Sequence, residues 1–287
     1  MQVIGDSLGA KIAKIIDADH IKLDERVFPD GEVNFRILGE KFDRNVVVAM
    51  RKGMTENINT YLAKIYFVVK TLYKEGCDID LVLPYFAYAR QDKVFRPGEP
   101  LSSEFVAQLF DPLVKKFITV TAHTHRRDSI MPMFKHAKAL NVSGVPALAN
   151  VLPAVEDAFV IGPDTESIVW AKEMADCLGT KDYGAFDKKR DINTGAIKIT
   201  AKDFDVKGKN VVMVDDMVST GGTTARAAEY IKSMGAKDIH MTFVHPVLAR
   251  NALEVLFSAN PQSVISTNTI ESPVSIGDVS PFIAEHL

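Results

Sequence analysis

Short apolar runs alternate with longer segments of helical period along this chain. The clearest runs are "NVVVAM", "IDLVLPYF", "FITVTA", "AFVIGPD", "NVVMVDD" and "DIHMTFVHP". A strand that is covered by helices on both faces is apolar along its whole length, as these runs are. The pattern therefore predicts an α/β fold built on mainly parallel sheets flanked by helices.

Three of the longer segments stop shortly before a glycine, the residue that most readily adopts the left-handed conformation at a helix end. They predict helices from Asn57 to Lys74, from Ser167 to Leu178 and from Thr223 to Met234. In the third segment, Ala228, Ile231 and Met234 recur at helical spacing and form one apolar face. With the runs on either side, this segment predicts the order strand, loop, helix, strand.

The chain also carries signals for a hairpin and for a domain junction. In "FPDGEVNFRI", Pro-Asp-Gly lies between two extended runs, which predicts an antiparallel hairpin in the first half. Near residue 145 the stretch "LNVSGVPALANVLPAVED" breaks the alternation of strands and helices. We therefore predict two domains, over residues 1–145 and 146–287, and expect them to be similar α/β units.

Composition narrows the possible functions. The 287 residues are 47% hydrophobic, which is enough for two domains with buried cores. A net charge of -3 argues against general nucleic-acid binding, which needs a broad excess of cations. Cys77 and Cys177 lack the spacing of a disulfide framework or zinc site. Without a signal peptide or an apolar stretch of membrane-spanning length, we expect a cytoplasmic protein with no membrane partner.

The stretch "VVMVDDMVSTGGTT", residues 211–224, combines two kinds of ligand-binding group. Gly221 and Gly222 allow backbone amides to approach a phosphate closely. Hydroxyl donors lie on both sides of the glycines, at Ser219, Thr220, Thr223 and Thr224. Asp215 and Asp216 would repel a phosphate, but they can accept hydrogen bonds from sugar hydroxyls. A sugar phosphate meets both demands, whereas the alternative is an acidic helix cap followed by a flexible turn.

This stretch resembles the phosphoribosyl diphosphate loop of type I phosphoribosyltransferases and of ribose-phosphate pyrophosphokinase. By itself it does not separate the two families. Three stretches of the first half resemble ribose-phosphate pyrophosphokinase: "FPDGEVNFRI", "YFAYARQDKVFRPGEPLSS" and "TAHTHRRD". With "GPD", "DKKRD" and the glycine loop, the likeness covers nearly the whole chain. It implies two similar type I phosphoribosyltransferase-like domains, the first with ATP and metal motifs and the second with a ribose 5-phosphate loop.

Two groups of residues are candidates for binding ATP. Arg90, Lys93 and Arg96 place cations on a loop after the "LVLPYF" run, where they suit a polyphosphate unless the loop is simply a solvated basic segment. By resemblance, Arg90 and Gln91 belong to the ATP site and Asp92 lies close by.

The second group is at the hairpin turn. There, Phe28 could stack on a base, and Asp30 or Glu32 could accept from an amino group. In the family the equivalent residues hold adenine from a neighbouring subunit, which implies at least a homodimer. The alternative is local packing of the hairpin tip.

The resemblance also assigns metal-binding and catalytic residues. It places a magnesium-associated histidine at His123 and an aspartate at Asp164, although Asp164 could equally cap the next helix. Magnesium prefers oxygen ligands and retains water, so one His and one Asp could act partly through water and ATP phosphates. The first lysine and the arginine of "DKKRD", Lys188 and Arg190, are expected to neutralise charge on the transferred group. Lys189 has no assigned role.

The implied reaction transfers the β,γ-diphosphoryl group of ATP to the C1 hydroxyl of ribose 5-phosphate, giving 5-phosphoribosyl 1-diphosphate and AMP. Two departures from the family pattern stand out. Ser219 replaces a frequent aspartate of the loop, and no acidic residue directly precedes the His123 and His125 pair. The alternatives are a phosphoribosyltransferase acting on a nucleobase and a non-catalytic regulatory relative.

Overall fold

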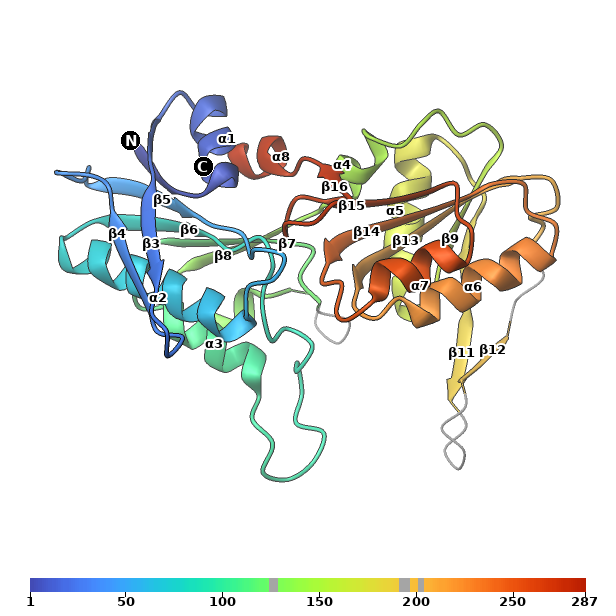
Figure 1. Cartoon of the computed structure of the whole chain (residues 1–287), viewed down its shortest axis with the longest axis horizontal. Coiled ribbons are helices and arrows are strands. Elements are labelled where there is room, and N and C mark those ends of the chain that lie inside the picture. The colour runs from blue at the N-terminus through green and yellow to red at the C-terminus, as the bar shows by residue number, and fades with distance from the viewer. Residues whose placement is uncertain (124–128, 191–196, 201–203) are drawn as a thin grey trace. The chain divides into compact units, whose positions relative to one another are not determined.

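The computed structural model describes residues 1–123, 129–190, 197–200 and 204–287, with the backbone course alone at 187–190 and 197–200. Its contacts divide the chain into two compact units (Figure 1). The first unit comprises Met1–Ser143, Thr269–Glu271 and Val279–Leu287, and the second comprises Gly144–Asn268 and Ser272–Asp278. The sequence had placed all of residues 146–287 in the second domain, whereas two C-terminal segments belong to the first unit.

The first unit contains a six-stranded parallel sheet in the order β2-β1-β5-β6-β7-β8. Its strands are β1 (Gln2–Gly5), β2 (Asp19–Ile21), β5 (Asn45–Ala49), β6 (Asp78–Val82), β7 (Lys116–Val120) and β8 (Lys138–Val142). The helices are α1 (Ser7–Ile15), α2 (Ile58–Lys74), α3 (Ser102–Phe110) and α8 (Ser280–Ala284), with a 3-10 turn at Met131–Met133. In Figure 1, α2 and α3 lie along one face of the sheet and α1 and α8 along the other.

The second unit contains another six-stranded parallel sheet, in the order β10-β9-β13-β14-β15-β16. Its strands are β9 (Ala158–Gly162), β10 (Tyr183–Ala185), β13 (Asn210–Val218), β14 (Ile239–Pro246), β15 (Ser263–Thr267) and β16 (Ser275–Gly277). The helices are α4 (Val145–Ala149), α5 (Ile168–Leu178), α6 (Gly222–Ser233) and α7 (Ala252–Ser258), with a 3-10 turn at Thr165–Ser167. The α/β prediction is confirmed, because both sheets are parallel and helices cover both faces of each.

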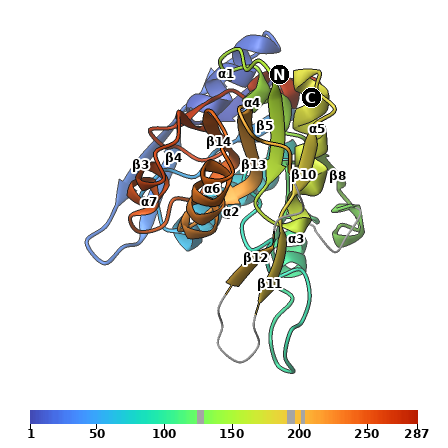
Figure 2. The ribbon, with the colours of Figure 1, turned by 90° about the vertical axis from the view of Figure 1, so that its right-hand side faces the viewer.

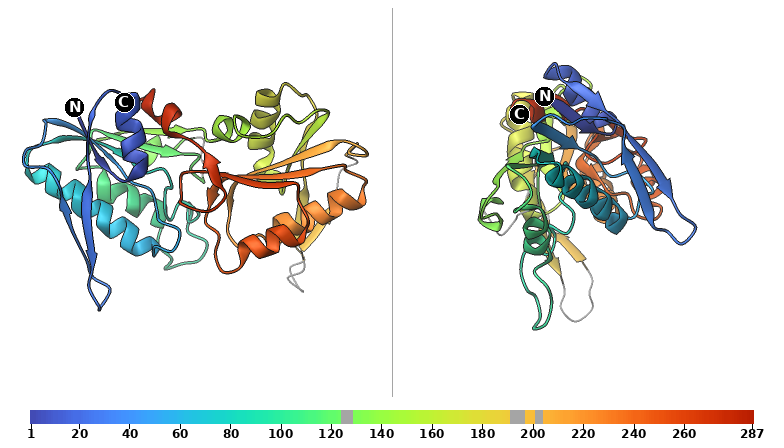
Figure 3. Two further views of the ribbon diagram at one scale, coloured as in Figure 1. Left: turned by 45° about the horizontal axis from the view of Figure 1, so that its top comes forward. Right: turned by 90° about the vertical axis from the view of Figure 1, so that its left-hand side faces the viewer.

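Each unit has a two-stranded antiparallel element inserted at the same point of its topology, after the edge strand that follows its first helix crossover. In the first unit this element is the hairpin β3 (Leu23–Val27) and β4 (Val33–Ile37), drawn in blue in Figure 3. In the second unit it is the arm β11 (Asp187–Arg190) and β12 (Ile197–Thr200), which projects from that unit in Figure 2. The predicted hairpin is confirmed, and "DKKR" forms the first strand of the arm.

In each sheet, the direction in which successive strands are added reverses between two central strands. From β1 the chain passes through α1 to the neighbour on one side, and from β5 it passes through α2 to the neighbour on the other side. The second unit repeats this arrangement at β9 and β13. Loops diverge at such a switch point, which leaves room for a ligand beyond the carboxyl ends of the strands.

The predicted helices form where their apolar faces and end signals place them. At the start of α2, the Asn57 side chain accepts a hydrogen bond from the Asn59 amide at 2.8 Å. Ala228 and Ile231 on α6 are fully buried, and Met234 packs against the same core. Gly76, Gly179 and Gly235 follow the three predicted helices with positive φ angles. No helix in the described ranges is both long and apolar enough to cross a membrane.

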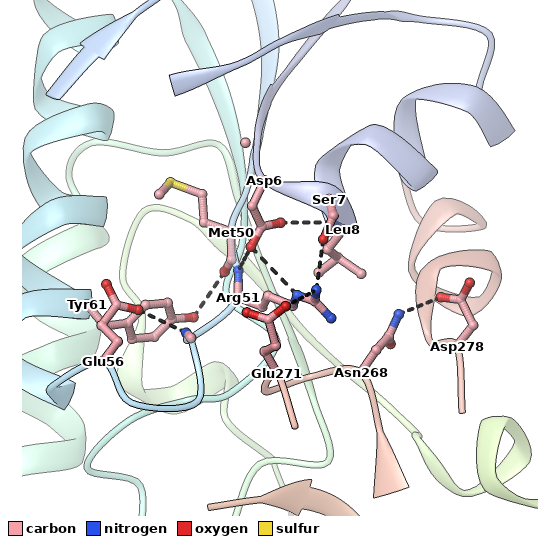
Figure 4. A network of polar contacts seen from close by, with 12 residues as sticks. Asp6, Ser7, Leu8, Met50, Arg51, Glu56, Tyr61, Asn268, Glu271 and Asp278 are labelled. Carbon is pink, nitrogen blue, oxygen red and sulfur yellow. Dashed lines mark hydrogen bonds and ion pairs between the residues drawn. The ribbon is translucent and has the colours of Figure 1, made fainter. Parts of the chain in front are cut away.

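Arg51 explains why the chain returns to the first unit after β15. It follows β5, and its guanidinium donates to Ser7 Oγ at 2.8 Å and to Glu271 Oε1 at 3.2 Å (Figure 4). Its backbone amide donates to Asp6 Oδ2 at 2.9 Å, and the Glu271 amide donates to the Lys52 carbonyl at 3.0 Å. The returning segment is therefore held by long-range polar contacts, which leave no pattern in the local sequence.

Candidate active site

Strand β13 carries two adjacent carboxylates to the switch point of the second unit. Asp215 is partly exposed, whereas Asp216 is 2% exposed. The Asp216 amide donates to Asp215 Oδ1 at 3.0 Å, which fixes the neighbouring carboxylate. The strand extends two residues further than its sequence suggested, because Met217 and Val218 still pair with β14. The carboxylates thus lie on a rigid strand.

Asp164 brings a third carboxylate to the same switch point. It lies two residues after β9, the strand next to β13. Its Oδ1 accepts from the Ser167 amide at 3.3 Å, and the Ser167 hydroxyl donates to the Asp164 carbonyl at 2.6 Å. Asp164 therefore caps a helical turn, as the structural alternative predicted. The cap also orients its partly exposed carboxylate.

The three carboxylates are coupled electrostatically. Burial raises the pKa of Asp215 well above its ordinary value of 3.8, and the negative charges of Asp216 and Asp164 raise it further. Such a concentration of charge destabilises the ligand-free protein and favours ligands that bring cations or hydroxyl donors. Perturbed carboxyl groups of this kind cluster at functional sites.

A glycine turn follows these carboxylates directly. Gly221 has a φ of 75° and precedes the first residue of α6. A Cβ atom at this position would lie 3.0 Å from Leu256 Cγ and 3.1 Å from the Ala252 carbonyl oxygen, so both conformation and space require glycine. At Gly222 a Cβ atom would meet no atom within 4 Å, which leaves the approach to this helix end open. Backbone amides at such an end suit a phosphate.

The hydroxyl residues of the turn differ in position. Ser219 is partly exposed and its carbonyl accepts from the Ala249 amide at 2.9 Å, which anchors the turn. Thr220 is exposed, Thr223 is partly exposed, and Thr224 is 4% exposed. The first three hydroxyls are thus placed to reach a ligand, whereas Thr224 belongs to the buried side of α6.

The arm β11–β12 begins one residue after Phe186. Residues 188 and 190 lie in β11 and pair with Ile199 and Ile197 of β12. The side chains of Lys188 and Arg190 lie outside the described part of the structure, so their catalytic roles stay predictions.

In the first unit, the basic ATP motif lies on a long loop between β6 and α3. Arg90, Lys93 and Arg96 are exposed there, whereas Asp92 is 3% exposed. Gln91 anchors the loop, because its Oε1 accepts from the Ser102 hydroxyl at 2.8 Å. Strand β6 ends at Val82, so the loop begins earlier than the apolar run suggested.

The hairpin tip is held by its own backbone. The Glu32 amide donates to Asp30 Oδ1 at 3.1 Å, and the Phe28 amide donates to the Glu32 carbonyl at 2.8 Å. The Arg26 guanidinium lies over the Phe28 ring, 4.9 Å from its centroid. Asp30 and Glu32 are exposed, so the tip presents two carboxylates beside a ring that is half-buried.

His123 lies beyond the end of the strand that the run "FITVTA" predicted. Strand β7 ends at Val120, and Thr121 has a φ of 38° that turns the chain away from the strand direction. His123 follows this turn and is partly exposed, whereas His125 lies outside the described residues. Within the described ranges no group of three or more His, Cys, Asp or Glu side chains could hold a metal ion.

The chain was compared with known proteins. Residues 5–113 match the N-terminal domain of ribose phosphate pyrophosphokinase, and residues 152–280 match the phosphoribosyl transferase domain. The ribose-phosphate pyrophosphokinase of Methanothermobacter thermautotrophicus is 34% identical over 97% of this chain and 95% of its own length. The chain belongs to the ribose-phosphate pyrophosphokinase family.

Two further relatives of this family cover the chain equally well. The enzyme of Methanopyrus kandleri is 34% identical over 98% of this chain and 95% of its own length. The crystal structure of phosphoribosylpyrophosphate synthetase from Mycobacterium smegmatis covers 100% of this chain and 96% of its own, with a TM-score of 0.83 at 27% identity. Since these matches include both units, the alternative of a nucleobase phosphoribosyltransferase is not favoured.

Sequence reasoning missed two residues, Thr165 and Phe186, that connect the arm to the segment with Asp164. The Thr165 hydroxyl donates to the Phe186 carbonyl at 3.3 Å, and the Phe186 amide donates to the Gly162 carbonyl at 3.1 Å. These bonds join the base of the arm to the segment that carries Asp164. Phe186 lies directly before "DKKRD", but a single phenylalanine gives no signal of this role.

The raised pKa of Asp215 yields a prediction about stability. Because folding raises this pKa, Asp215 lowers the free energy of unfolding, and this loss of stability grows as pH rises from the ordinary pKa of 3.8 through the raised value. Asp215→Asn should therefore raise the melting temperature of the ligand-free protein at pH 8, by about 2 °C or more. Thermal unfolding followed by circular dichroism from pH 8 to pH 4 should show the gain disappear as pH falls.

The control for this measurement is Asp205→Asn, an exposed aspartate of the same unit. It removes the same formal charge without relieving burial, so its melting temperature should stay near that of the original protein at each pH. A destabilised Asp215→Asn protein at pH 8 would show that the carboxylate stabilises the fold, contrary to the prediction.

Proposed function

We propose that this protein transfers the β,γ-diphosphoryl group of ATP to the C1 hydroxyl of ribose 5-phosphate. The products are 5-phosphoribosyl 1-diphosphate and AMP, which serve nucleotide biosynthesis. The observation that carries the proposal is the meeting of Asp164, Asp215 and Asp216 beside the Gly221 turn at one switch point. A ligand with a phosphate at one end and hydroxyls at the other satisfies both halves of that arrangement.

Ribose 5-phosphate fits the second unit in one direction. Its 5-phosphate would accept hydrogen bonds from amides at residues 220–224 and from the hydroxyls of Ser219, Thr220 and Thr223. The ribose hydroxyls would donate to Asp215 and Asp216. The rigid spacing between the turn and the carboxylates, set by β13, would keep the C1 hydroxyl away from the phosphate subsite.

ATP would be bound by residues of the first unit. The exposed cations Arg90, Lys93 and Arg96 suit its phosphates, and Gln91 fixes the loop that carries them. Phe28, Asp30 and Glu32 suit adenine, and the exposed position of the two carboxylates at a hairpin tip supports a contact with the site of a neighbouring subunit. We therefore propose self-association, at least into a homodimer. The cytoplasmic location stays a prediction.

The reaction needs alignment and charge neutralisation more than a covalent intermediate. The C1 oxygen of ribose 5-phosphate forms a bond to the β-phosphorus of ATP. The bond from that phosphorus to the oxygen bridging the α- and β-phosphates breaks, and AMP leaves with this oxygen. The hydroxyl proton passes to water, and no side chain is assigned as a general base. Lys188 and Arg190 would stabilise the negative charge that develops around the β-phosphate.

The donor groups at the second-unit switch point suit Mg²⁺ in kind, but among the described residues they do not form a set of three or more ligands for one ion. They are carboxylate oxygens, which magnesium prefers, and their mutual repulsion would be relieved by a cation. Asp164 would hold the ion on this unit, and His123 is the candidate ligand of the first unit. When bound, the ion would neutralise charge on the ATP phosphates.

Phosphorus NMR of a mixture of the protein, ATP, Mg²⁺ and ribose 5-phosphate tests this proposal. AMP and a new anomeric diphosphate should appear in equal amounts and only when ribose 5-phosphate is present. ADP together with a sugar bisphosphate would instead show transfer of a single phosphoryl group. Binding of both substrates without any product would favour the regulatory alternative.

A further inference from the structure

The two ends of the β11–β12 arm meet in one aromatic contact. Phe186 precedes β11 and is fully buried, and Phe204 follows β12 by four residues. Their ring centroids lie 5.4 Å apart at an interplanar angle of 83°, the edge-to-face geometry that aromatic pairs prefer. Because the contact joins the entry and the exit of the arm, it determines where the arm leaves the second unit.

Two further rings connect this contact to the strands and helix of the candidate site. Tyr230 on α6 lies 6.1 Å from Phe186, and Phe159 on β9 lies 5.7 Å from Phe204. Helix α6 starts at the glycine turn, and β9 leads to Asp164. The aromatic cluster of Phe159, Phe186, Phe204 and Tyr230 therefore links the base of the arm to the elements that hold the turn and the carboxylate.

The backbone of Phe186 is fixed as well as its ring. Its amide donates to the Gly162 carbonyl at 3.1 Å, and its carbonyl accepts from the Thr165 hydroxyl at 3.3 Å. Gly162 and Thr165 lie on either side of the segment with Asp164. The backbone N–H and C=O of Phe186, the residue directly before the arm, are thus both hydrogen-bonded to this segment.

Gly184 makes room for the ring of Phe204, the cluster residue that follows β12. A Cβ atom at this position would lie 2.6 Å from Phe204 Cε1, closer than real Cβ contacts. Gly184 lies in β10, so the Phe204 ring packs directly on strand backbone. An alanine at position 184 would have to displace the ring, whereas a smaller residue at position 204 would make space for the methyl group.

We propose that the aromatic cluster positions the arm for catalysis, with Phe204 and Gly184 as its exit-side positioning residues. This proposal rests on the proposed function. The cluster residues touch no substrate and act by positioning the arm that carries Lys188 and Arg190. Displacement of the arm base would move residues 188 and 190 relative to Asp164 and the glycine turn. Catalysis depends steeply on such placement, whereas binding at the turn does not involve the arm base.

Phe204→Leu tests the proposal by two independent readouts. We expect kcat for AMP formation to fall about tenfold or more, with the KM for ribose 5-phosphate changed by no more than about threefold. Hydrogen–deuterium exchange should become faster in peptides from residues 187–200 and stay unchanged in peptides from β13 and β14. The exchange readout needs no chemistry, so it reports on the arm even if the original protein forms a different product.

The contact itself is tested by a double substitution. Gly184→Ala alone should lower kcat and speed exchange in the arm, because its methyl group displaces the Phe204 ring. In Gly184→Ala/Phe204→Leu the two defects should compensate in part, so that kcat exceeds that of at least one single variant. Ile265→Ala is the control for general loss of stability, because it leaves a cavity at a buried residue of β15 outside the core that contains Phe159 and Phe186.

Three results would overturn the proposal. One is a Phe204→Leu protein with unchanged kcat and unchanged exchange in the arm. Another is an Ile265→Ala protein that loses kcat and arm protection to the same extent at equal loss of stability. The third is additive behaviour of the double variant, which would show that the two positions are not coupled. Failure of the original protein to form AMP would count against the proposed function and not against the cluster.

Discussion

Lys188→Ala should lower the turnover of AMP formation by about 10²–10³-fold, the usual effect of removing one group that stabilises charge in a transition state. Its affinity for ribose 5-phosphate should change little. Negative charge at the β-phosphate grows as the leaving oxygen departs, so a cation at position 188 interacts more strongly with the transition state than with bound substrates. Loss of that interaction lowers kcat and kcat/KM together.

Steady-state kinetics with both substrates, and calorimetric titration with ribose 5-phosphate, would measure the two effects separately. Lys189→Ala is the matched control, because it removes the same charge from the neighbouring position of β11. Its turnover should remain within about threefold of the original protein. Unchanged turnover in Lys188→Ala would remove Lys188 from the catalytic residues, and equal losses in both variants would point to a general effect of charge on the arm.

The sequence predicts the fold best where one local pattern decides the structure. The apolar runs correspond to buried strands of the two sheets, since a strand covered on both faces leaves no polar positions. The helix from residue 57 starts and ends as expected, because an asparagine cap and a glycine end signal frame a long apolar face. In the same way, the Pro-Asp-Gly turn places the hairpin within the first unit.

Features that depend on distant contacts were not predictable in this way. The short helix α1 contains Gly9 and has only a brief apolar face, so its local pattern is weak. The return of residues 269–271 to the first unit depends on Glu271 meeting Arg51, which is far away in sequence. The bend after β7 comes from the unusual φ of Thr121 and placed His123 outside the strand.

The candidate site likewise has features that one stretch of sequence predicts and features that depend on distant contacts. Asp215, Asp216 and the glycines stand together in the sequence, so their shared location was predictable from one stretch. Their electrostatic coupling to Asp164 was not, because it requires β9 and β13 to be neighbours in the sheet. The positioning of the arm was also not predictable, since Phe186, Phe204 and Tyr230 come together only through the packing of the second unit.

The two inserted elements place the proposed adenine contacts and the proposed catalytic cations at equivalent points of one topology. The hairpin with Phe28 and the arm with Lys188 follow equivalent edge strands of equivalent sheets. At the first-unit switch point, however, the Glu56 side chain accepts from the Gly53 amide at 3.0 Å and pairs with Lys64 at 2.6 Å. The loop after β5 thus binds a carboxylate of its own chain, whereas the loop after β13 leaves its helix end open.

Asp216 is the residue for which binding and stability conflict most directly. It is 2% exposed, and its charge is one of the causes that raise the pKa of Asp215. Two adjacent carboxylates in such a position are costly to the ligand-free protein. A role in which both accept hydrogen bonds from sugar hydroxyls accounts for that cost, because the ligand then supplies hydrogen-bond donors to both negatively charged groups.

Asp216→Asn should therefore raise the KM for ribose 5-phosphate by about 10- to 100-fold, since a hydrogen bond to a charged group contributes about 1.5–3 kcal/mol. Asparagine fills the same space, but an NH2 group replaces one carboxylate oxygen and donates where a hydroxyl hydrogen must be accepted. The KM for ATP should stay unchanged, as should both constants in the control Asp238→Asn at the amino end of β14. An unaltered KM for ribose 5-phosphate would mean that Asp216 does not contact the sugar, and its burial would then require a purely structural explanation.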